Sequence, residues 1–445
     1  MNKPITLQTR REFLRTGILG GALSWTVPAF LSNTFAALQA EAANSATQTA
    51  TGKDSSILVV LQMAGGNDGL NTVVPYSNDY YFKARRRIAQ PANSVLKIND
   101  EIGLHQGMAG FKELYDGGNL SIVQGIGYPN PNRSHFRSTE IWQTASDADK
   151  VDSYGWIGRY FDNACPGADP SVGVNIGRQM PQAFSAKNPI GISLENPQSY
   201  RFIAGRQMAG GEMNPVEKSF RELNQPPSED SSTDNSGATI GAISGATPRH
   251  GSPLDFLERT ALDAEVSSDK ILAITKRVEN QAEYPASQLA SSLKLVAKLI
   301  AGGLPTRIFY VSQGGYDTHT NQLGQQDRLL KDLGDSVSAF VKDLKAQGNF
   351  QRVMLMTFSE FGRRVAENAN GGTDHGAAAP MFIIGNKVKA GLHGKYPSLA
   401  PTDLFNGDLC YNVDFRTVYA GILEEWLKTK SAPILGRQFA LLRLV

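Results

Sequence analysis

Cysteine and histidine are scarce in this chain, whose 445 residues include only two cysteines and six histidines. Cys165 and Cys410 could form one disulfide in an oxidising compartment, but two cysteines are too few for a zinc ribbon or a disulfide-rich scaffold. Any bound metal must therefore use histidine and carboxylate ligands. The dinucleotide-binding motif G-x-G-x-x-G, the haem-attachment motif C-x-x-C-H and iron–sulfur cysteine spacings are also absent, which argues against an oxidoreductase.

A strong charge excess and long apolar runs are missing as well. The formal net charge is +2. Residues 1–42 contain four basic and two acidic side chains, so the rest of the chain is formally neutral. Because proteins that bind nucleic acid or anionic membranes show a basic patch or stripe, we expect no nucleic-acid partner. Beyond residue 42 no apolar run approaches the ~18 residues that cross a bilayer, so we expect no transmembrane segment and a soluble mature protein.

The N-terminal segment has the pattern of a twin-arginine export signal. Arg10 and Arg11 are followed by one spacer and then by Phe13 and Leu14. A modestly apolar stretch over residues 18–31 and an A-x-A site at residues 40–43 complete the pattern. We therefore predict a signal peptide over residues 1–42, the Tat translocase as a partner during export, and a periplasmic or extracellular location. The alternative is a chance arginine pair before a short core helix.

The remaining chain alternates apolar runs with amphipathic stretches. Residues 43–56 are small and polar, a flexible lead-in. The pattern predicts strands over residues 57–62, 120–124, 169–176, 306–312, 353–358 and 381–384, and helices over 254–279, 286–301, 325–347 and 414–427. This alternation predicts an α/β domain over residues 57–445, with a mostly parallel central sheet and helices on both faces. The polar, low-complexity residues 225–253 are interpreted as an insertion into that domain rather than as a linker between two domains, because the chemical motifs lie on both sides of them.

Four loops next to predicted strands carry acidic residues, and two of them add a histidine. Ligands of open α/β sheets bind at the carboxyl ends of strands, so these loops are the candidate site. The candidates are Asp68, Asp317 with His319, Glu360, and Asp374 with His375. An isolated aspartate of this kind is most often a turn or cap residue. Taken together, the histidines and carboxylates predict a site for zinc, manganese or iron, and the extra carboxylates suit a second, harder ion such as magnesium or calcium.

A serine precedes another predicted helix. Ser134 stands next to His135, with Arg133 and Arg137 one turn apart. The common role of such a serine is an N-cap. The functional alternative is a nucleophile or an anion site, in which the helix dipole and the two arginines stabilise negative charge. No G-x-S-x-G elbow is present, which disfavours ordinary α/β-hydrolase chemistry.

The other histidines and the arginine tracts receive no functional role. His250 lies in the low-complexity segment, while His105 and His393 lack a carboxylate neighbour in a motif. The tracts 85–87 and 363–364 are predicted to be solvated, although Arg363 near Glu360 could face the site.

Several motifs in combination resemble an exported bacterial family known as domain of unknown function 1501, which is related to the alkaline phosphatase and sulfatase clan. Besides the export signal, the motifs lie at Gly65–Thr72, Tyr128–His135, Gly315–His319, Thr357–Arg363 and Gly372–Gly376. The resemblance covers roughly residues 56–427. It implies an alkaline phosphatase-like α/β fold with one or two divalent metals at the strand ends.

The resemblance also implies residue roles. Asp68 would match the metal aspartate after the first strand. Asp317 and His319 would match the pair that holds the first metal, although their spacing is tighter than usual in the clan. His375 would match the late metal histidine, and Ser134 would occupy the position of the nucleophile.

One position departs from the clan. An Asp-His pair usually follows the strand that ends here at Phe358, but this chain has Glu360 and Phe361. Phenylalanine cannot ligate a metal, so the departure puts the second metal site in doubt.

Two functions follow as hypotheses. The first is an exported metal-dependent hydrolase of phosphate or sulfate esters, in which Arg133 or Arg137 neutralises the developing charge. The second is a non-catalytic secreted protein that keeps the fold and a structural metal and binds a partner or polymer. The substrate itself is not predicted.

Overall fold

The computed structural model describes residues 55–188, 190–197 and 268–445. The expected signal peptide and the expected insertion at 225–253 lie outside these residues. So does most of the helix expected over 254–279, of which residues 268–277 are described and helical.

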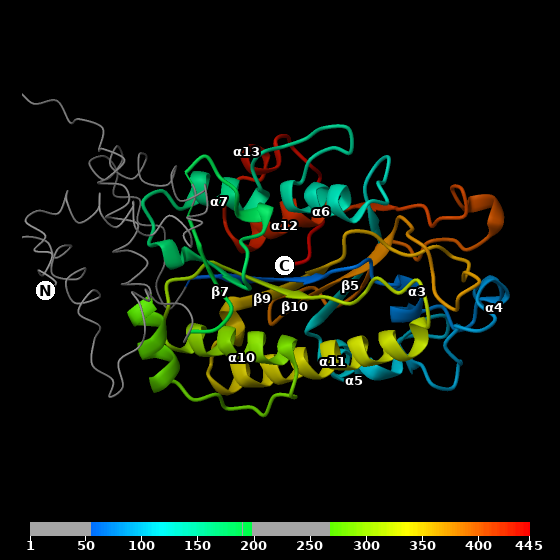
Figure 1. Ribbon diagram of the computed structural model, residues 1–445, viewed down its shortest axis with the longest axis horizontal. Helices are drawn as coiled ribbons and strands as arrows, with labels where there is room; N and C mark the ends of the chain where they lie inside the picture. The colour runs from blue at the N-terminus through cyan, green and yellow to red at the C-terminus, as the bar shows by residue number, and fades with distance from the viewer. Residues whose placement is uncertain (1–54, 189, 198–267) are drawn as a thin grey trace, which may run out of the picture. The chain divides into compact units, whose positions relative to one another are not determined.

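One mixed sheet forms the centre of the fold (Figure 1). Its strands are β1 (Ile57–Met63), β5 (Leu120–Gly127), β6 (Gly173–Ile176), β7 (Ile192–Leu194), β8 (Ile308–Gln313), β9 (Val353–Phe358), β10 (Ala379–Gly385), β11 (Gly391–His393) and β12 (Val413–Asp414). The main order is β11-β5-β10-β9-β1-β8-β6-β7, and β12 pairs with β5. All pairings are parallel except those of β10, which runs antiparallel to both β9 and β5. The prediction of a mostly parallel α/β sheet is confirmed.

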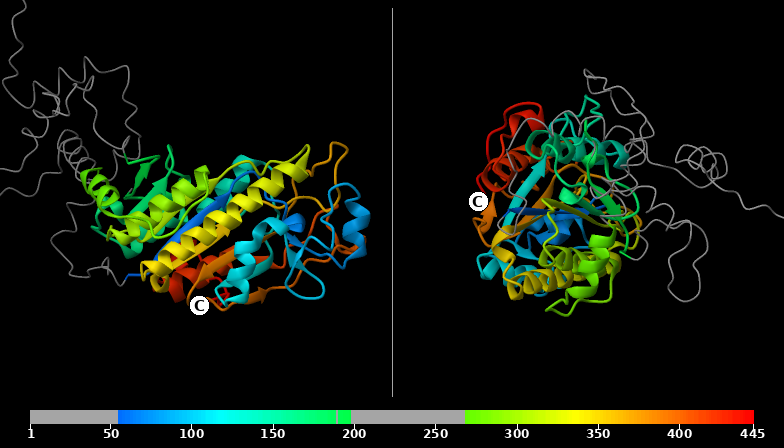
Figure 2. Two further views of the ribbon diagram at one scale, coloured as in Figure 1. Left: turned by 90° about the horizontal axis from the view of Figure 1, so that it is seen from below. Right: turned by 90° about the vertical axis from the view of Figure 1, so that its left-hand side faces the viewer.

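Helices cover both faces of this sheet (Figures 1 and 2). One face carries α5 (Ala109–Asp116), α10 (Gln288–Ala301) and α11 (Gln322–Ala346), and the other carries α6 (His135–Thr144), α7 (Trp156–Ala164), α12 (Phe415–Gly421) and α13 (Ala432–Leu435). A π-helical turn, Ile422–Trp426, continues α12. A small antiparallel sheet consists of β2 (Val73–Val74), β3 (Leu96–Lys97) and β4 (Gly103–Leu104). In the sequence, α3 (Gly69–Thr72) precedes β2, and α4 (Asp79–Ala84) stands between β2 and β3.

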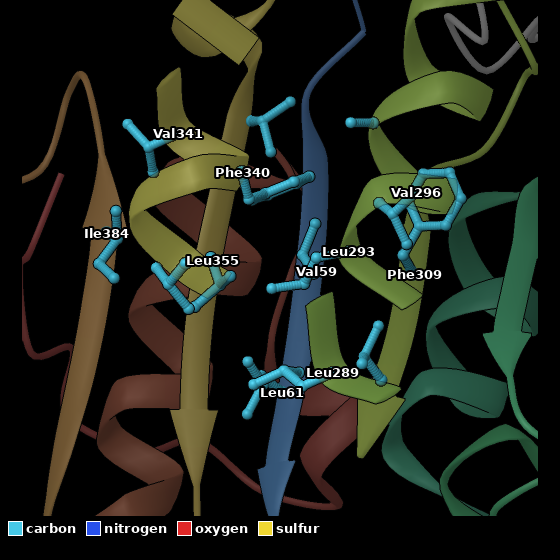
Figure 3. Packing of buried hydrophobic residues seen from close by; sticks show 14 of the residues in the cluster. Val59, Leu61, Leu289, Leu293, Val296, Phe309, Phe340, Val341, Leu355 and Ile384 are labelled. Atoms are coloured by element: carbon cyan, nitrogen blue, oxygen red, sulfur yellow. The ribbon is translucent and has the colours of Figure 1, made fainter. Parts of the chain in front are cut away.

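The strand β1 shows how the sequence produces these layers. All seven of its residues are buried, as the continuous apolar run predicts. Because side chains alternate along a strand, Val59 and Leu61 join the cluster with α10 and α11, whereas Leu58 and Val60 join the cluster on the opposite face. Figure 3 shows the first interface, where sheet residues pack against Leu289, Leu293 and Val296 of α10 and Phe340 and Val341 of α11.

The fold also bears on the cysteines and on membrane crossing. Cys165 is buried and Cys410 is exposed, and both thiols are free, so these cysteines form no disulfide. Among the described residues, none of the helices combines the length and the hydropathy that a membrane crossing requires.

Candidate metal centre

The candidate loops meet at one edge of the sheet. β1, β8 and β9 are neighbours and parallel, so their carboxyl ends lie together. β5 runs in the same direction as β9, because both are antiparallel to β10, and it brings the start of α6 to the same edge. The loop of residues 371–376 enters β10 there. The loops that the strand-end rule singles out therefore lie together.

Glycine allows the closest approach between the loops. Gly65 has a φ of +120°, and a Cβ at this position would lie 2.4 Å from the backbone nitrogen of Asp317. Gly66 has a φ of +79°, and a Cβ there would lie 2.2 Å from the ring of Phe361. A side chain at either position would push two loops apart, so the glycines after β1 are needed for the geometry of the site.

A buried guanidinium ties these loops together. Arg363 donates hydrogen bonds to the carbonyl oxygens of Gly66 (2.7 Å), Tyr316 (3.0 Å) and Thr373 (2.8 Å) and to Oδ1 of Asp317 (2.8 Å). Arg363 is therefore not solvated but faces the site, which was the alternative that the sequence left open, and the carbonyl groups of three loops replace water around its donors. Arg363 therefore holds three loops in the arrangement that positions the other side chains of the site.

Three histidines gather around one aspartate within this frame. Ligand atoms of His135, Asp317 and His375 all lie within 4.8 Å of one another. Nε2 of His375 is 3.3 Å from Oδ1 of Asp317, and Nε2 of His135 is 3.5 Å from Oδ2. Nε2 of His319 lies 3.2 Å from the same Oδ1 and 2.9 Å from Nε2 of His375. We call His135, His319, His375 and Asp317 the histidine cluster.

Each imidazole is oriented by a partner on its other nitrogen. Nδ1 of His135 is 2.9 Å from Oε1 of Glu360. Nδ1 of His319 is 3.1 Å from Oδ1 of Asp374. Nδ1 of His375 is 2.7 Å from the carbonyl oxygen of Arg133, which can only accept, so Nδ1 of His375 is the donor.

The partners of the three Nδ1 atoms determine the protonation of the opposite nitrogens. Carboxylates also accept hydrogen bonds, so all three Nδ1 atoms carry the proton in the neutral imidazoles. All three Nε2 atoms then present lone pairs toward Asp317. This is the arrangement by which proteins orient histidine ligands for a metal.

The contacts of the cluster test whether a metal fits. Nε2 of His135 is buried and has no hydrogen-bond partner among the described residues. Nε2 of His319 and Nε2 of His375 lie 2.9 Å apart although neither carries a proton in the tautomers above. A shared cation removes both problems, since it binds lone pairs that otherwise repel one another. Three imidazoles and one carboxylate suit zinc, manganese or iron.

The local electrostatics favour the metal-binding protonation states. Burial alone would raise the pKa of Asp317, but the hydrogen bond from Arg363 and the positive charge of its guanidinium outweigh it, so this pKa lies below its ordinary value. Hydrogen bonds from Asn368 and His319 lower the pKa of Asp374. Burial lowers the pKa of His375, which favours the neutral ring. The carboxylates are therefore ionised and His375 is neutral near pH 7.

The predicted ligands Glu360 and Asp374 contact the Nδ1 atoms of the cluster histidines rather than the Nε2 atoms that face Asp317. Glu360 is buried, and its Oε1 accepts from the backbone N–H of Gly65 (2.8 Å) as well as facing His135. Asp374 faces His319 and Asn368. Both carboxylates orient a histidine, so we assign them to the supporting shell of the proposed metal site.

The structure does not bring Asp68 into the cluster. Its side chain is fully buried, with Oδ2 2.6 Å from Nη1 of Arg85 and also bonded to Gln322. Oδ1 accepts from the backbone N–H of Leu70 (3.1 Å), which caps α3. Both oxygens are therefore engaged, and we leave Asp68 out of the proposed metal site. Arg85 is completely buried, which corrects the prediction that the whole tract 85–87 is solvated.

The predicted catalytic residues lie at the start of α6, in different environments. Ser134 is the N-cap residue, yet its exposed side chain makes no capping hydrogen bond. The guanidinium of Arg133 binds Asp408. That of Arg137 pairs with Glu140 at 2.8 Å and also donates to backbone carbonyls of the 147–150 loop. In the described part of the chain, neither guanidinium is hydrogen-bonded to the histidine cluster.

His135 is the residue that sequence reasoning did not assign. Its carboxylate partners, Asp317 and Glu360, follow it by more than 180 positions, so no local motif reveals them. The available signal was its position at a helix start after a buried strand of the same sheet. Phe361 packs against the ring of His135 (centroids 4.9 Å apart) and that of His375 (4.4 Å), filling the place where the clan resemblance suggests a ligand.

A mostly parallel sheet with histidines and a carboxylate gathered at the carboxyl ends of its strands defines an α/β protein with a candidate metal site. A family model described as "Protein of unknown function (DUF1501)" matches residues 55–414, and the chain belongs to this family. No curated protein sequence matches the chain.

Several solved structures match this chain at low identity and low TM-score. A protein of the alkaline phosphatase superfamily from Vibrio parahaemolyticus is 8% identical, with 92% of this chain and 77% of that chain covered and a TM-score of 0.35. The PsFucS1 sulfatase from Pseudoalteromonas sp. is 9% identical, with 87% and 75% covered and a TM-score of 0.31. The C-terminal periplasmic domain of EcEptC from Escherichia coli, in complex with Zn, is 10% identical, with 76% and 75% covered and a TM-score of 0.32.

Proposed function

We propose that this protein is an exported metal-dependent hydrolase of phosphate or sulfate esters, with the metal held by the histidine cluster. The observation that carries the proposal is the convergence of three oriented Nε2 atoms on the carboxylate of Asp317. When bound, a metal ion in such a site polarises an ester oxygen and lowers the pKa of a coordinated water.

The exposure of the cluster favours catalysis over a purely structural role. The side chain of Asp317 is 49% exposed and that of His319 is 41% exposed. Structural zinc sites are enclosed by four protein ligands, whereas catalytic sites stay open to water or substrate. The cluster offers four ligand residues, but its solvent-exposed side leaves room for the fifth position that catalytic zinc sites can use. A substrate can therefore approach from the side of Asp317 and His319.

Ser134 is the proposed nucleophile. It precedes His135 directly, and its hydroxyl is exposed and unused as a helix cap. In the proposed step its Oγ forms a bond to phosphorus or sulfur while the bond from that atom to the alcohol oxygen of the ester breaks, and the hydroxyl proton of Ser134 passes through water to the departing alcohol oxygen. A second water then hydrolyses the covalent bond, which releases phosphate or sulfate and restores the hydroxyl. The first N–H groups of α6 lack intrahelical partners and are suited to bind the anionic group. Arg133 and Arg137 are not needed for this role, since their guanidinium groups have other partners.

Export is part of the proposal. The twin-arginine pattern, the apolar stretch and the A-x-A site in residues 1–43 support passage through the Tat translocase and a periplasmic or extracellular location. That route carries folded proteins, so a metal could be inserted before export.

The test uses the purified full chain, elemental analysis and a panel of aryl phosphates and sulfates assayed with zinc, manganese and iron. We expect one bound metal and turnover of at least one ester class, with Ser134→Ala keeping the metal and losing turnover. Ser287→Ala is the matched control, because Ser287 also precedes a helix but does accept a capping bond, from Ala290 N–H at 3.0 Å. It should cost about 1 kcal/mol of stability and leave turnover unchanged. Metal-loaded protein without turnover of any ester would reject the hydrolase.

The second candidate is a non-catalytic secreted binding protein with a structural metal. Phe361 favours it, since this buried ring packs where the clan resemblance suggests a ligand, and Asp68 is committed to Arg85. Under this alternative, Ser134→Ala leaves the cellular role intact and Asp317→Ala lowers stability. Loss of the cellular role in a stable Ser134→Ala protein would exclude it.

A further inference from the structure

A tight turn buries an aspartate beside the histidine cluster. Phe405 and Asp408 exchange two backbone hydrogen bonds of 3.0 Å, and the central residues Asn406 and Gly407 both have positive φ, +54° and +80°. Asn-Gly is a favoured pair for such a turn. The turn directs Asp408 inward, where its side chain is only 2% exposed.

Two arginines lie against this buried carboxylate and offset its burial in part, since its Oδ1 accepts no hydrogen bond from the described residues. Nη2 of Arg133 is hydrogen-bonded to Oδ2 of Asp408, and Nε of Arg364 lies 3.6 Å from Oδ1. Each arginine side chain is 37% exposed. A buried carboxylate is costly unless it is paired, so Asp408 holds both arginines close to the turn.

Backbone groups of the same two arginines form hydrogen bonds with His375 and with the residue that precedes it. The carbonyl oxygen of Arg133 accepts the hydrogen bond from Nδ1 of His375 at 2.7 Å. The backbone N–H of Arg364 donates to the carbonyl oxygen of Asp374, the preceding residue, at 3.0 Å. Arg363, next to Arg364, pairs with His375 in an antiparallel β-bridge. Through Arg133 and Arg364, Asp408 therefore contacts both chain segments that form hydrogen bonds around His375.

We propose that Asp408 is a positioning residue for the metal centre, acting through Arg133 and Arg364 to keep Nδ1 of His375 protonated and its Nε2 directed at Asp317. The inference rests on the proposed metal site and deepens it. It also gives Arg133 a role different from charge neutralisation: its side chain anchors the segment and its carbonyl oxygen selects the tautomer of His375. Outer partners of this kind tune metal affinity, because they fix the direction of the ligand's lone pair.

The first measurement is nitrogen NMR of the metal-free full chain labelled at histidine. In the wild type we expect His375 in the Nδ1–H tautomer. Asp408→Asn weakens the hold on Arg133 and should give a mixture of tautomers at His375 alone. Asp403→Asn is the control, because Asp403 is exposed in the same segment and its side-chain contacts are with Ser398 and Thr402.

The second measurement is zinc affinity by competition with a chelator. Asp408→Asn should bind Zn²⁺ about tenfold more weakly than the wild type, and Asp403→Asn should not differ from it. Asp408→Glu, which keeps the charge, should recover part of the loss. If Asp408→Asn does not fold, Arg133→Gln replaces it, since this variant removes the ion pair and retains the carbonyl oxygen. Adding Arg133→Gln to Asp408→Asn should produce little further loss, because both remove the same contact.

The outcomes separate this inference from the proposed function. An unchanged tautomer and unchanged zinc affinity in both Asp408→Asn and Arg133→Gln would overturn the positioning role. A tautomer that responds to Asp408→Asn in a protein that binds none of zinc, manganese and iron would support the positioning of His375 and reject the metal-dependent hydrolase. Normal zinc binding and tautomer response without ester turnover would likewise retain the inference and reject only the hydrolase.

Discussion

Two groups of polar side chains meet at the carboxyl edge of the sheet and differ in how their hydrogen bonds are satisfied. Around Asp68, every side-chain oxygen has a partner: Arg85 and Gln322 on Oδ2 and a backbone N–H on Oδ1. Nothing of this carboxylate is exposed. Around Asp317, half the carboxylate is exposed, and the Nε2 atoms of the neighbouring histidines face one another without donors.

The comparison shows what distinguishes a closed polar network from a binding site. Both aspartates follow glycine residues after a buried strand, so their local sequences are alike. Buried polar groups are normally paired, and a group that is left without a partner needs an explanation. The unpaired Nε2 of His135 is such a group, and the proposed metal would account for it.

The largest effect is expected from Asp317→Ala. Asp317 supplies the only carboxylate in the histidine cluster, and each histidine of the cluster has an Nε2 within 3.5 Å of it. Metal content, measured by elemental analysis after dialysis, should fall from about one equivalent to near zero. The fold should survive, since Arg363 keeps its carbonyl partners in the other loops. A variant that retained its full metal content would remove Asp317 from the site.

Asp68→Ala should have the opposite effect. It leaves the guanidinium of Arg85 buried without its carboxylate, and breaking a buried pair in this way costs about 3–5 kcal/mol. The free energy of unfolding, measured in urea, should fall by this amount while the metal content stays at the wild-type level. If stability were unchanged and the metal were lost, Asp68 would belong to the metal site and the comparison would fail.

The sheet could largely be predicted from the sequence. The run of Val353–Phe358 coincides with β9, and Ile57–Met63 extends the expected strand by one residue, because buried parallel strands read as continuous apolar runs. The direction of β10 could not be read in this way, since an apolar run has no direction. The helices α5 and α7 were not predicted, because eight or nine residues offer few turns for a helical period to emerge.

The candidate site was predicted in part. The rule that loops meet at strand ends correctly brought Asp317, His319 and His375 together. It could not separate ligand-facing groups from the carboxylates behind them, since that depends on which ring nitrogen each contacts. His135 has no acidic neighbour in the sequence. Its contact with Glu360 depends on the pairing of β5 with β10, which the sequence does not reveal.

A smaller effect is expected from Asp374→Asn. Asp374 orients His319 through Nδ1, so the substitution weakens the orientation and keeps the ligand. Zinc affinity should fall about tenfold, with little change in stability, because Asp374 is exposed. Asp327→Asn is the matched control: Asp327 forms the same kind of contact with His105, at 2.8 Å, away from the cluster. Equal losses of zinc affinity in the two variants would mean that the contact of Asp374 has no specific role.

The smallest effect concerns His105, the counterpart of the cluster histidines in a closed environment. Its Nδ1 accepts from the backbone N–H of Gly107 (3.1 Å), so Nε2–H donates to Asp327 and neither nitrogen is left for a metal. Burial lowers the pKa of His105 despite the opposing charge of Asp327. The folded protein then binds the proton less readily than the unfolded chain, so this contribution to stability is complete above the unfolded pKa of about 6.5 and is lost as the pH falls through that value toward the folded pKa. In metal-free protein, urea unfolding at several pH values should show a graded loss of stability below about pH 6.5, and His105→Gln should show a smaller loss. Parallel pH profiles for the two proteins would mean that His105 has the same pKa in the folded and the unfolded state. The closed environment of His105 would then differ from the open histidine cluster in geometry only.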